Sequence, residues 1–515
     1  MTESPARHLK TLAERQEPKG SEENSEAHRL FRSVPGHEHK GGQKSHHDVA
    51  GIVPPGATGV IYVTDRASAN GFQPGGDGWA NFGQGAPESE PNLFRFARKQ
   101  PGQTVAAEAD RRKLWSRAAG HLPGAAPRPD NLSLSDLSAL AGEDVNEYAP
   151  TTGVPALREA VAKYYNETYR KGKASQYTAK NVCIVPGGRA GLTRVAAVIG
   201  DVYVAYTIPE YTSYDQMLAA FKRIVPVPSV LKPEDNYHLS VDALEQMIHD
   251  LGVSALFLSN PHNPTGQVIH GEELKRMVEL SKKGTTMILD EFYEQYIYDL
   301  GEGAQVSAAE FVDDVNDDNV VIINGLTKCW RLPGWRVCWV VGPETLITAL
   351  GQSGSFLDGG APHPLQVAAI PLLDPDLVRS ERLILQRVFR EKRDFVVQRL
   401  RQLGFQVKNP PGATFYCWLD LTALPAPLNS GLVFFEEALK EKVIVVPGQF
   451  FDLNPSHRRN LLDAPCEHFV RLSFGPPLEE IKRGLDGIER LIKRVSKLTA
   501  EGTRLEEVIG RDLKR

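Results

Sequence analysis

Asn324-Gly-Leu-Thr-Lys-Cys-Trp-Arg-Leu-Pro-Gly-Trp-Arg336 holds a lysine, Lys328, eight residues before an arginine, Arg336. The stretch follows an apolar run at 320–323, which is typical of a buried strand. Open α/β sheets bind their ligands just beyond the carboxyl ends of strands, so we expect Lys328 in a binding crevice. A desolvated lysine amine there can form an imine with a carbonyl compound. Arg336 would offer a fixed cation to a phosphate. In isolation, both residues could equally be solvated charges.

Upstream of this stretch, short apolar runs alternate with segments of helical periodicity. The runs lie at 182–185, 202–206, 255–258 and 287–289. Such alternation predicts an α/β fold with a mostly parallel sheet and helices on both faces. Beyond about residue 375, a long charged helical segment precedes the apolar runs at 414–419, 443–446 and 469–474. This change of pattern predicts a second, smaller α+β domain.

The chain has 515 residues, which is long enough for two or three domains. Its composition and hydrophobic patterns predict four parts. Residues 1–50 are poor in aliphatic side chains and predict a disordered tail. Residues 51–130 are expected to form an N-terminal arm and part of the small domain. Residues 131–350 would form the large, cofactor-binding domain, and residues 351–515 the C-terminal small domain.

Polar residues follow three of the predicted strands directly. The segment Ser259-Asn-Pro-His-Asn-Pro-Thr-Gly266 has two Asn-Pro steps, which force extended or turn backbone at a strand end. A plain turn is the alternative interpretation. Asp290-Glu-Phe-Tyr293 follows the next apolar run, and a buried aspartate there needs a cation or a protonated ring nitrogen as its partner. A helix N-cap is the alternative for Asp290.

In chain order, three strand ends thus offer an amide, then a carboxylate with a tyrosine, then a lysine followed by an arginine. A pyridoxal 5'-phosphate ring needs this set. The amide and the tyrosine can hydrogen-bond the ring hydroxyl, the carboxylate can keep the ring nitrogen protonated, and the lysine can hold the aldehyde. The combination therefore predicts pyridoxal 5'-phosphate as the cofactor, with no metal site.

The region from about residue 78 to 495 resembles the class I/II aminotransferases, which are pyridoxal-phosphate-dependent enzymes of fold type I. The segment 260–266 carries that family's motif. The resemblance implies that Asn263 and Tyr293 bond the ring hydroxyl and that Asp290 pairs with the ring nitrogen. It also implies that Lys328 is the Schiff-base lysine and Arg336 a phosphate contact.

The same resemblance implies residues that bind the substrate. Val470-Arg-Leu-Ser-Phe474 is similar to the family's carboxylate-binding motif, so Arg471 is expected to grip the substrate carboxylate through two hydrogen bonds. The alternative for Arg471 is a surface charge at a strand edge. Asn263 is also expected to contact the substrate. Gly85 lies where family members bring backbone close to the substrate.

Further positions resemble the family less specifically. Pro186-Gly-Gly-Arg-Ala190 resembles the phosphate-binding turn before a helix, with Gly188 as a backbone contact. Tyr211 resembles the aromatic residue that stacks on the cofactor ring, and core packing is its alternative role. Tyr148 resembles a tyrosine that reaches the phosphate in a neighbouring subunit. The resemblance therefore implies a homodimer with shared active sites.

The chain also departs from the family pattern at the phosphate site. Gly325 stands where many members have a serine three residues before the lysine, and Arg189 follows Gly188 where a serine or threonine is common. Two hydroxyl donors are therefore missing. We expect Arg189 and Thr327 to compensate for them as cofactor contacts.

These expectations predict an enzyme that transfers an amino group between an α-amino acid and a 2-oxo acid by a ping-pong mechanism. Lys328, Asp290 and Tyr293 are its expected catalytic residues, with Lys328 moving the substrate's α-proton. The alternative is a lyase similar to the aminocyclopropane-carboxylate synthases, because the segment 332–336 also resembles theirs. Transcription regulators with an aminotransferase-like domain need an N-terminal DNA-binding module, and the first 75 residues show no helix-turn-helix pattern.

The bulk properties exclude several other partners. A net charge of −5 gives no sign of binding to nucleic acid or to anionic membranes. No apolar run is long enough to cross a bilayer, and the N-terminal residues lack the apolar core of a signal peptide. The five cysteines are scattered, without the spacing of zinc sites or disulfide frameworks. We therefore expect a soluble protein in the reducing cytoplasm.

Overall fold

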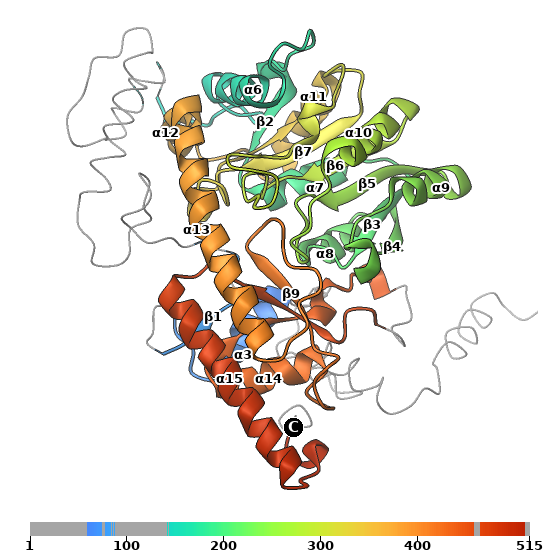
Figure 1. Ribbon diagram of the computed structural model, residues 1–515. Helices are drawn as coiled ribbons and strands as arrows, with labels where there is room; N and C mark the ends of the chain where they lie inside the picture. Colours follow the sequence, from blue (N-terminus) through green and yellow to red (C-terminus); the bar gives the residue numbers. More distant parts are fainter. Residues whose placement is uncertain are drawn as a thin grey trace, which may run out of the picture.

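The computed structural model describes residues 59–74, 78–83, 85, 87, 138, 142, 144–457 and 464–509. The predicted disordered tail at 1–50 lies outside the described residues, as does most of the predicted arm at 51–130. The described residues fold around two main sheets, which Figure 1 shows one above the other.

The larger sheet has seven strands in the order β2-β8-β7-β6-β5-β3-β4. Every neighbouring pair is parallel except those that involve β8, which runs antiparallel to both β2 and β7. Most positions in the central strands are buried, as parallel sheets require when helices cover both faces. The strands are β2 (Val182–Val185), β3 (Val202–Ile208), β4 (Ile224–Val230), β5 (Val253–Ser259), β6 (Thr286–Asp290), β7 (Val320–Gly325) and β8 (Cys338–Val341).

Helices cover both faces of this sheet because parallel strands need crossover connections. On one face, α7 contacts both α8 and α11. On the other face, α9 contacts α10 and α6 contacts α12, and the turn at 308–310 contacts both α10 and α6. The predicted α/β fold is therefore confirmed. The helices are α6 (Pro155–Tyr169), α7 (Gly188–Val198), α8 (Ser213–Ala220), α9 (Val241–Leu251), α10 (Gly271–Glu279), α11 (Glu344–Leu357) and α12 (His363–Ala369).

The predicted smaller α+β domain is built on an antiparallel sheet with the order β11-β12-β9. Beside it, β1 pairs in parallel with β10, although the two strands are far apart in the sequence. The strands are β1 (Ala80–Asn81), β9 (Tyr416–Asp420), β10 (Val443–Ile444), β11 (Val446–Pro447) and β12 (Phe469–Ser473). Its helices are α3 (Gly59–Ala69), α14 (Gly431–Lys440) and α15 (Leu478–Ala500).

The long helix α13 (Pro375–Gln402) runs along both sheets in Figure 1. It begins sharply because the Asp374 carboxylate accepts the Leu377 N–H at 3.0 Å and Pro375 fits the first turn. The division of the chain at residue 350 stays a prediction. α11 continues across that position, and both α11 and α12 pack on the large sheet's side of the molecule.

Short 3₁₀ turns connect the larger elements. They lie at Ala179–Asn181, Pro233–Asp235, Leu280–Lys283, Ala308–Glu310, Pro333–Trp335, Ile370–Leu373, Gly448–Phe451, Pro455–His457 and Leu505–Glu507. Among the helices of the described residues, none combines the length and the apolar character that crossing a lipid bilayer demands.

Candidate active site

The candidate residues gather at the carboxyl end of the large sheet. In the register of the parallel strands, Ser259 at the end of β5 lies beside Asp290 at the end of β6, and Asp290 lies beside Ile323 near the end of β7. Parallel strands bring their carboxyl ends to a single edge, so the loops that follow them meet there. The loops after β5 and β7 carry Asn263 and Lys328.

Lys328 is half-buried among aromatic rings and backbone. Its Nζ donates a hydrogen bond to the carbonyl of Gly85 and lies 5.9 Å from the ring centroids of both Tyr293 and Phe415. Burial, reinforced by the charge of Arg471, lowers the pKa of Lys328 to about 8. About a tenth of this amine is therefore neutral, and so nucleophilic, at pH 7, far more than for an ordinary lysine.

Gly85 makes this close approach of the backbone possible. A Cβ atom at this position would lie 3.1 Å from Lys328 Nζ and 2.8 Å from the hydroxyl oxygen of Tyr416. A larger residue would push both groups away from their positions. Gly85, which was predicted to bring backbone close to the substrate, contacts Lys328 through its carbonyl from 243 residues away in the sequence.

Asp290 is 6% exposed, and few hydrogen-bond donors among the described residues face its carboxylate. The Tyr214 hydroxyl donates to Oδ2 at 3.3 Å, and the Phe292 N–H approaches Oδ1 at 3.5 Å. Burial first, and then the nearby charge of Glu210, raise the pKa of Asp290 to about 7. Burial disfavours the ionised form of this carboxyl group, so a cationic partner such as a protonated ring nitrogen would stabilise it.

Arg471 and Asn263 form the next part of the site. Arg471 Nη1 donates to Asn263 Oδ1 at 2.8 Å, and Nη2 donates to the Gly83 carbonyl at 3.1 Å. The Arg471 side chain is 3% exposed, so it is no strand-edge surface charge. Its guanidinium carbon lies 4.0 Å from the Tyr416 ring centroid and 5.0 Å from that of Phe451.

The Nε atom of Arg471 is buried and has no hydrogen-bond partner among the described residues. Buried donors are nearly always satisfied in proteins, and charged donors above all. This free donor therefore marks a place for an anionic acceptor, such as a carboxylate. An arginine is suited to that role because its planar fork matches two carboxylate oxygens.

The turn before α7 and the Arg336 side chain together form a cradle of groups that attract anions. α7 begins at Gly188, and Gly187 has a φ of +105°, which favours glycine. A Cβ atom on Gly187 would lie 1.7 Å from Arg336 Nη2, which also approaches the Pro186 carbonyl at 3.3 Å. The Arg336 guanidinium thus lies against the start of a helix, where backbone N–H groups attract anions.

A comparison with known families identifies the chain. The model of the family "Aminotransferase class I and II" matches residues 119–488. The chain belongs to this family.

Individual relatives support the assignment. The chain is 29% identical over 373 residues to a probable aspartate/prephenate aminotransferase of Aquifex aeolicus, covering 71% of this chain and 88% of the relative. It is also 29% identical over 353 residues to an aspartate aminotransferase of Thermotoga maritima, covering 67% and 82%. The aspartate aminotransferase of Thermus thermophilus with maleate has the same fold, with a TM-score of 0.65, 21% identity and coverage of 84% and 97%. The predicted aminotransferase is confirmed, and the lyase alternative is not favoured.

The aminotransferase has no room for the family serine at position 325. A Cβ atom on Gly325 would lie 2.5 Å from the Cα of Cys338 on the neighbouring strand β8. The Thr327 hydroxyl lies 3.3 Å from Cys338 Sγ instead. Similarly, a Cβ atom on Gly188 would meet the Phe292 ring at 2.5 Å.

Arg189 and Tyr211 lie together at the rim of this site. Arg189 Nε donates to the Tyr211 hydroxyl at 3.2 Å, and the charge of Arg189 contributes to the lowered pKa of Lys328. The Tyr211 ring is half-buried and stands edge-on to Tyr214 at 5.7 Å. Tyr148, by contrast, is 94% exposed and is not packed with the other candidate residues.

Two residues that the sequence did not single out belong to this constellation. The Tyr416 hydroxyl lies 2.9 Å from that of Tyr293, and the Tyr416 ring carries Arg471 on its face. Glu210 is fully buried in the turn after β3, and its charge raises the pKa of Asp290. The only available signal for Glu210 was an acidic residue directly after a buried strand, beside the predicted Tyr211.

Proposed function

We propose that this aminotransferase carries pyridoxal 5'-phosphate on Lys328 and passes an amino group from an α-amino acid to a 2-oxo acid in two half-reactions. The observation that carries the proposal is the convergence of the half-buried Lys328 amine and the Asp290 carboxylate, at one edge of the large sheet, with Asn263 and its partner Arg471 from β12. The family match supports the same cofactor.

The residues present fit the chemical groups of this cofactor. Asp290, whose pKa is raised by burial, is suited to a protonated ring nitrogen. Asn263 and Tyr293 can donate to a ring hydroxyl. The cradle of Gly187 and Arg336 suits a phosphate because it joins a helix start to a guanidinium.

The cofactor, when bound, supplies an electron sink for the electrons of a broken bond at the substrate's α-carbon. The protein's residues do the rest. Arg471 orients the substrate carboxylate, with Asn263 fixing the guanidinium. The Lys328 amine would move the proton at the α-carbon, and its pKa of about 8 suits both accepting and donating that proton.

We also propose that the protein is a homodimer with shared active sites and that it is located in the cytoplasm. The exposed Tyr148 supports it, because a tyrosine so open to solvent can reach a neighbouring subunit. The side chain of Phe356 on α11 is also 74% exposed. All five cysteines are free and buried, as suits a reducing compartment.

The test of this function is a panel of amino acids mixed in turn with the purified, cofactor-loaded protein. We expect the visible absorbance of the cofactor to fall and one oxo acid to be released per site. Aspartate heads the panel because relatives are named for it. Double-reciprocal plots for two substrates should be parallel. Release of ammonia or of a cyclised product would contradict amino-group transfer.

Replacing Arg336 with alanine should weaken binding of pyridoxal 5'-phosphate by roughly 10- to 100-fold, the cost of losing charge-assisted hydrogen bonds. Titration of the apoprotein, followed by fluorescence, measures this affinity. Pyridoxal without its phosphate should bind the variant and the parent equally. Arg490→Ala removes another exposed arginine, on α15, and should change neither affinity. Equal loss for both ligands would contradict a phosphate role.

Replacing Asp290 with asparagine should stabilise the apoprotein increasingly as the pH rises. The folded-state pKa of about 7 lies above the ordinary 3.8, so the aspartate costs folding stability once the pH passes 3.8, and this cost grows until about pH 7. The advantage of Asp290→Asn should therefore increase by roughly 2 kcal/mol between pH 5.5 and 8.5. Urea unfolding at both pH values measures it. A constant difference would show that Asp290 titrates normally.

A further inference from the structure

Glu210, in the turn after β3, joins two strands at the edge that holds the candidate site. Its side chain is fully buried. One carboxylate oxygen accepts the Tyr211 N–H at 2.7 Å and the Ser259 hydroxyl at 2.5 Å. The other accepts the Thr207 hydroxyl at 2.9 Å and the Ser259 N–H at 3.1 Å. A buried carboxylate is costly unless donors surround it, and here the donors come from the ends of both β3 and β5.

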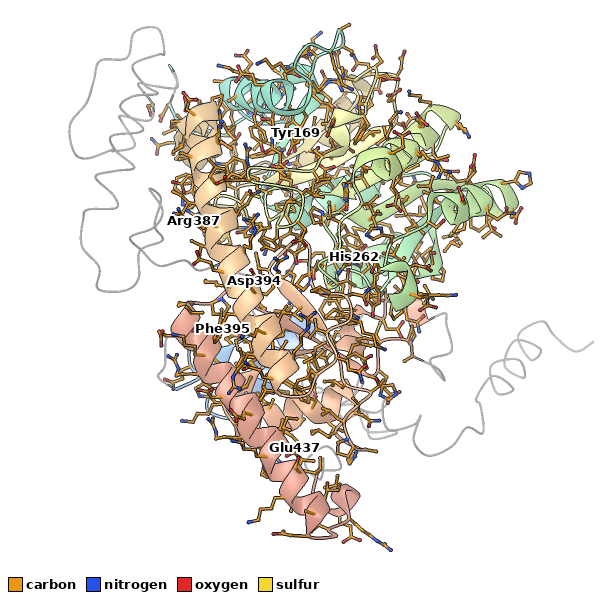
Figure 2. The ribbon with its side chains drawn as sticks, in the orientation of Figure 1. Tyr169, His262, Arg387, Asp394, Phe395 and Glu437 are labelled. Atoms are coloured by element: carbon orange, nitrogen blue, oxygen red, sulfur yellow. The ribbon has the colours of Figure 1, made fainter. Side chains whose placement is uncertain are left out.

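Two of these donors lead to residues of the proposed cofactor site. Tyr211 is held through its own backbone N–H. The Ser259 hydroxyl, which donates to Glu210, also accepts the backbone N–H of Asn263 at 3.1 Å. The neighbouring His262 has Nε2 3.5 Å from Glu210 Oε2, and Figure 2 labels it in the region between the two sheets.

Glu210 also reaches the small domain. Its backbone N–H donates to the Phe451 carbonyl at 3.1 Å. The Phe451 ring lies 5.0 Å from the Arg471 guanidinium carbon. One residue therefore connects the loop after β3, the loop after β5 and the segment packed against the carboxylate-binding arginine.

We propose that Glu210 is a positioning residue that holds Tyr211 and Asn263 against the cofactor. This inference rests on the proposed function. The position requires a carboxylate because all four donors point at two acceptor oxygens. A glutamine would turn an NH₂ group toward two of them. The negative charge also adds to that of Asp290, which favours a cationic ring nitrogen beside them.

The test compares Glu210→Gln and Ser259→Ala with the parent protein by titrating the apoprotein with pyridoxal 5'-phosphate and by following the cofactor's visible absorbance against pH. Glu210→Gln should weaken cofactor binding about tenfold and raise the pH midpoint of the absorbance change by about one unit. The midpoint rises because a displaced Asn263 no longer stabilises the anionic ring oxygen. Ser259→Ala removes the hydroxyl that links Glu210 to Asn263 and leaves the Glu210 carboxylate bonded to Tyr211 and Thr207, so it should raise the midpoint with a smaller effect on affinity.

Glu437→Gln is the matched control. Glu437 is a fully buried carboxylate on α14, paired with Lys440 at 2.8 Å and Arg494 at 3.0 Å in the small domain. Its loss should lower the thermal midpoint of unfolding without moving affinity or absorbance.

The same pattern in Glu210→Gln, a lower thermal midpoint with parental affinity and absorbance, would overturn the positioning role. If that variant does not fold, an unchanged pH midpoint in Ser259→Ala overturns it instead. A parent protein without any absorbance that depends on Lys328 would refute the proposed function, whatever Glu210 does.

Discussion

Replacing Lys328 with alanine is expected to abolish amino-group transfer, with a loss of at least about 10³-fold in turnover, because one side chain both holds the cofactor and moves the α-proton. The protein should still bind pyridoxal 5'-phosphate through Asp290 and the cradle at Arg336. Its visible absorbance should resemble that of the free aldehyde. Absorbance and single-turnover release of oxo acid measure the two effects separately.

Lys392→Ala is the control for this variant. Lys392, like Lys328, donates to a backbone carbonyl, that of Pro476 at 2.7 Å, but it is buried on α13. Its replacement should reduce stability and leave the absorbance of the bound cofactor unchanged. An unaltered spectrum in Lys328→Ala would disprove the assignment of Lys328.

Replacing Arg471 with lysine should lower kcat/KM for amino acids by roughly 100-fold. A lysine keeps the charge but loses the planar pair of donors that matches a carboxylate, and the loss of about 2–3 kcal/mol corresponds to this factor. It also gives up the bond to Asn263. Steady-state kinetics with several amino acids, together with cofactor titration, measure whether only the substrate is affected.

A primary amine without an α-carboxylate provides the control for Arg471. It should react slowly and at the same rate with the parent and with Arg471→Lys, because this substrate offers no carboxylate for residue 471 to bind. If the amine and the amino acid lose the same factor, Arg471 acts on the structure of the site rather than on the substrate.

The fold and the main chemical groups could be predicted from local patterns. Lys328 and Asp290 each follow an apolar run directly, and the rule that parallel strands end at one edge places them together without any coordinates. The confirmed family membership agrees with that interpretation. The roles of the individual side chains stay predictions, which the variants described above address.

Residues whose partners lie far away in the sequence could not be predicted in this way. Tyr416 meets Tyr293 across 123 residues, and Glu210 meets Ser259 across 49. No local periodicity encodes such pairs, because they depend on how loops from different elements pack. Tyr148 is a further case, since its predicted role requires a second copy of the chain.

The short-range spacing of apolar and polar residues was enough to predict the α/β fold and the order of the chemical groups at the strand ends, and motifs such as the segment 260–266 carried the resemblance to the family. The environment of each group depends on the packing of segments that are distant in the sequence. Three features arise where distant segments exclude water: the burial that lowers the pKa of Lys328, the contact of Gly85 with its amine, and the Nε atom of Arg471, which has no hydrogen-bond partner in the described part of the chain. The structure likewise explains Gly325, since the Cα of Cys338 on the adjacent strand leaves no space for a side chain there.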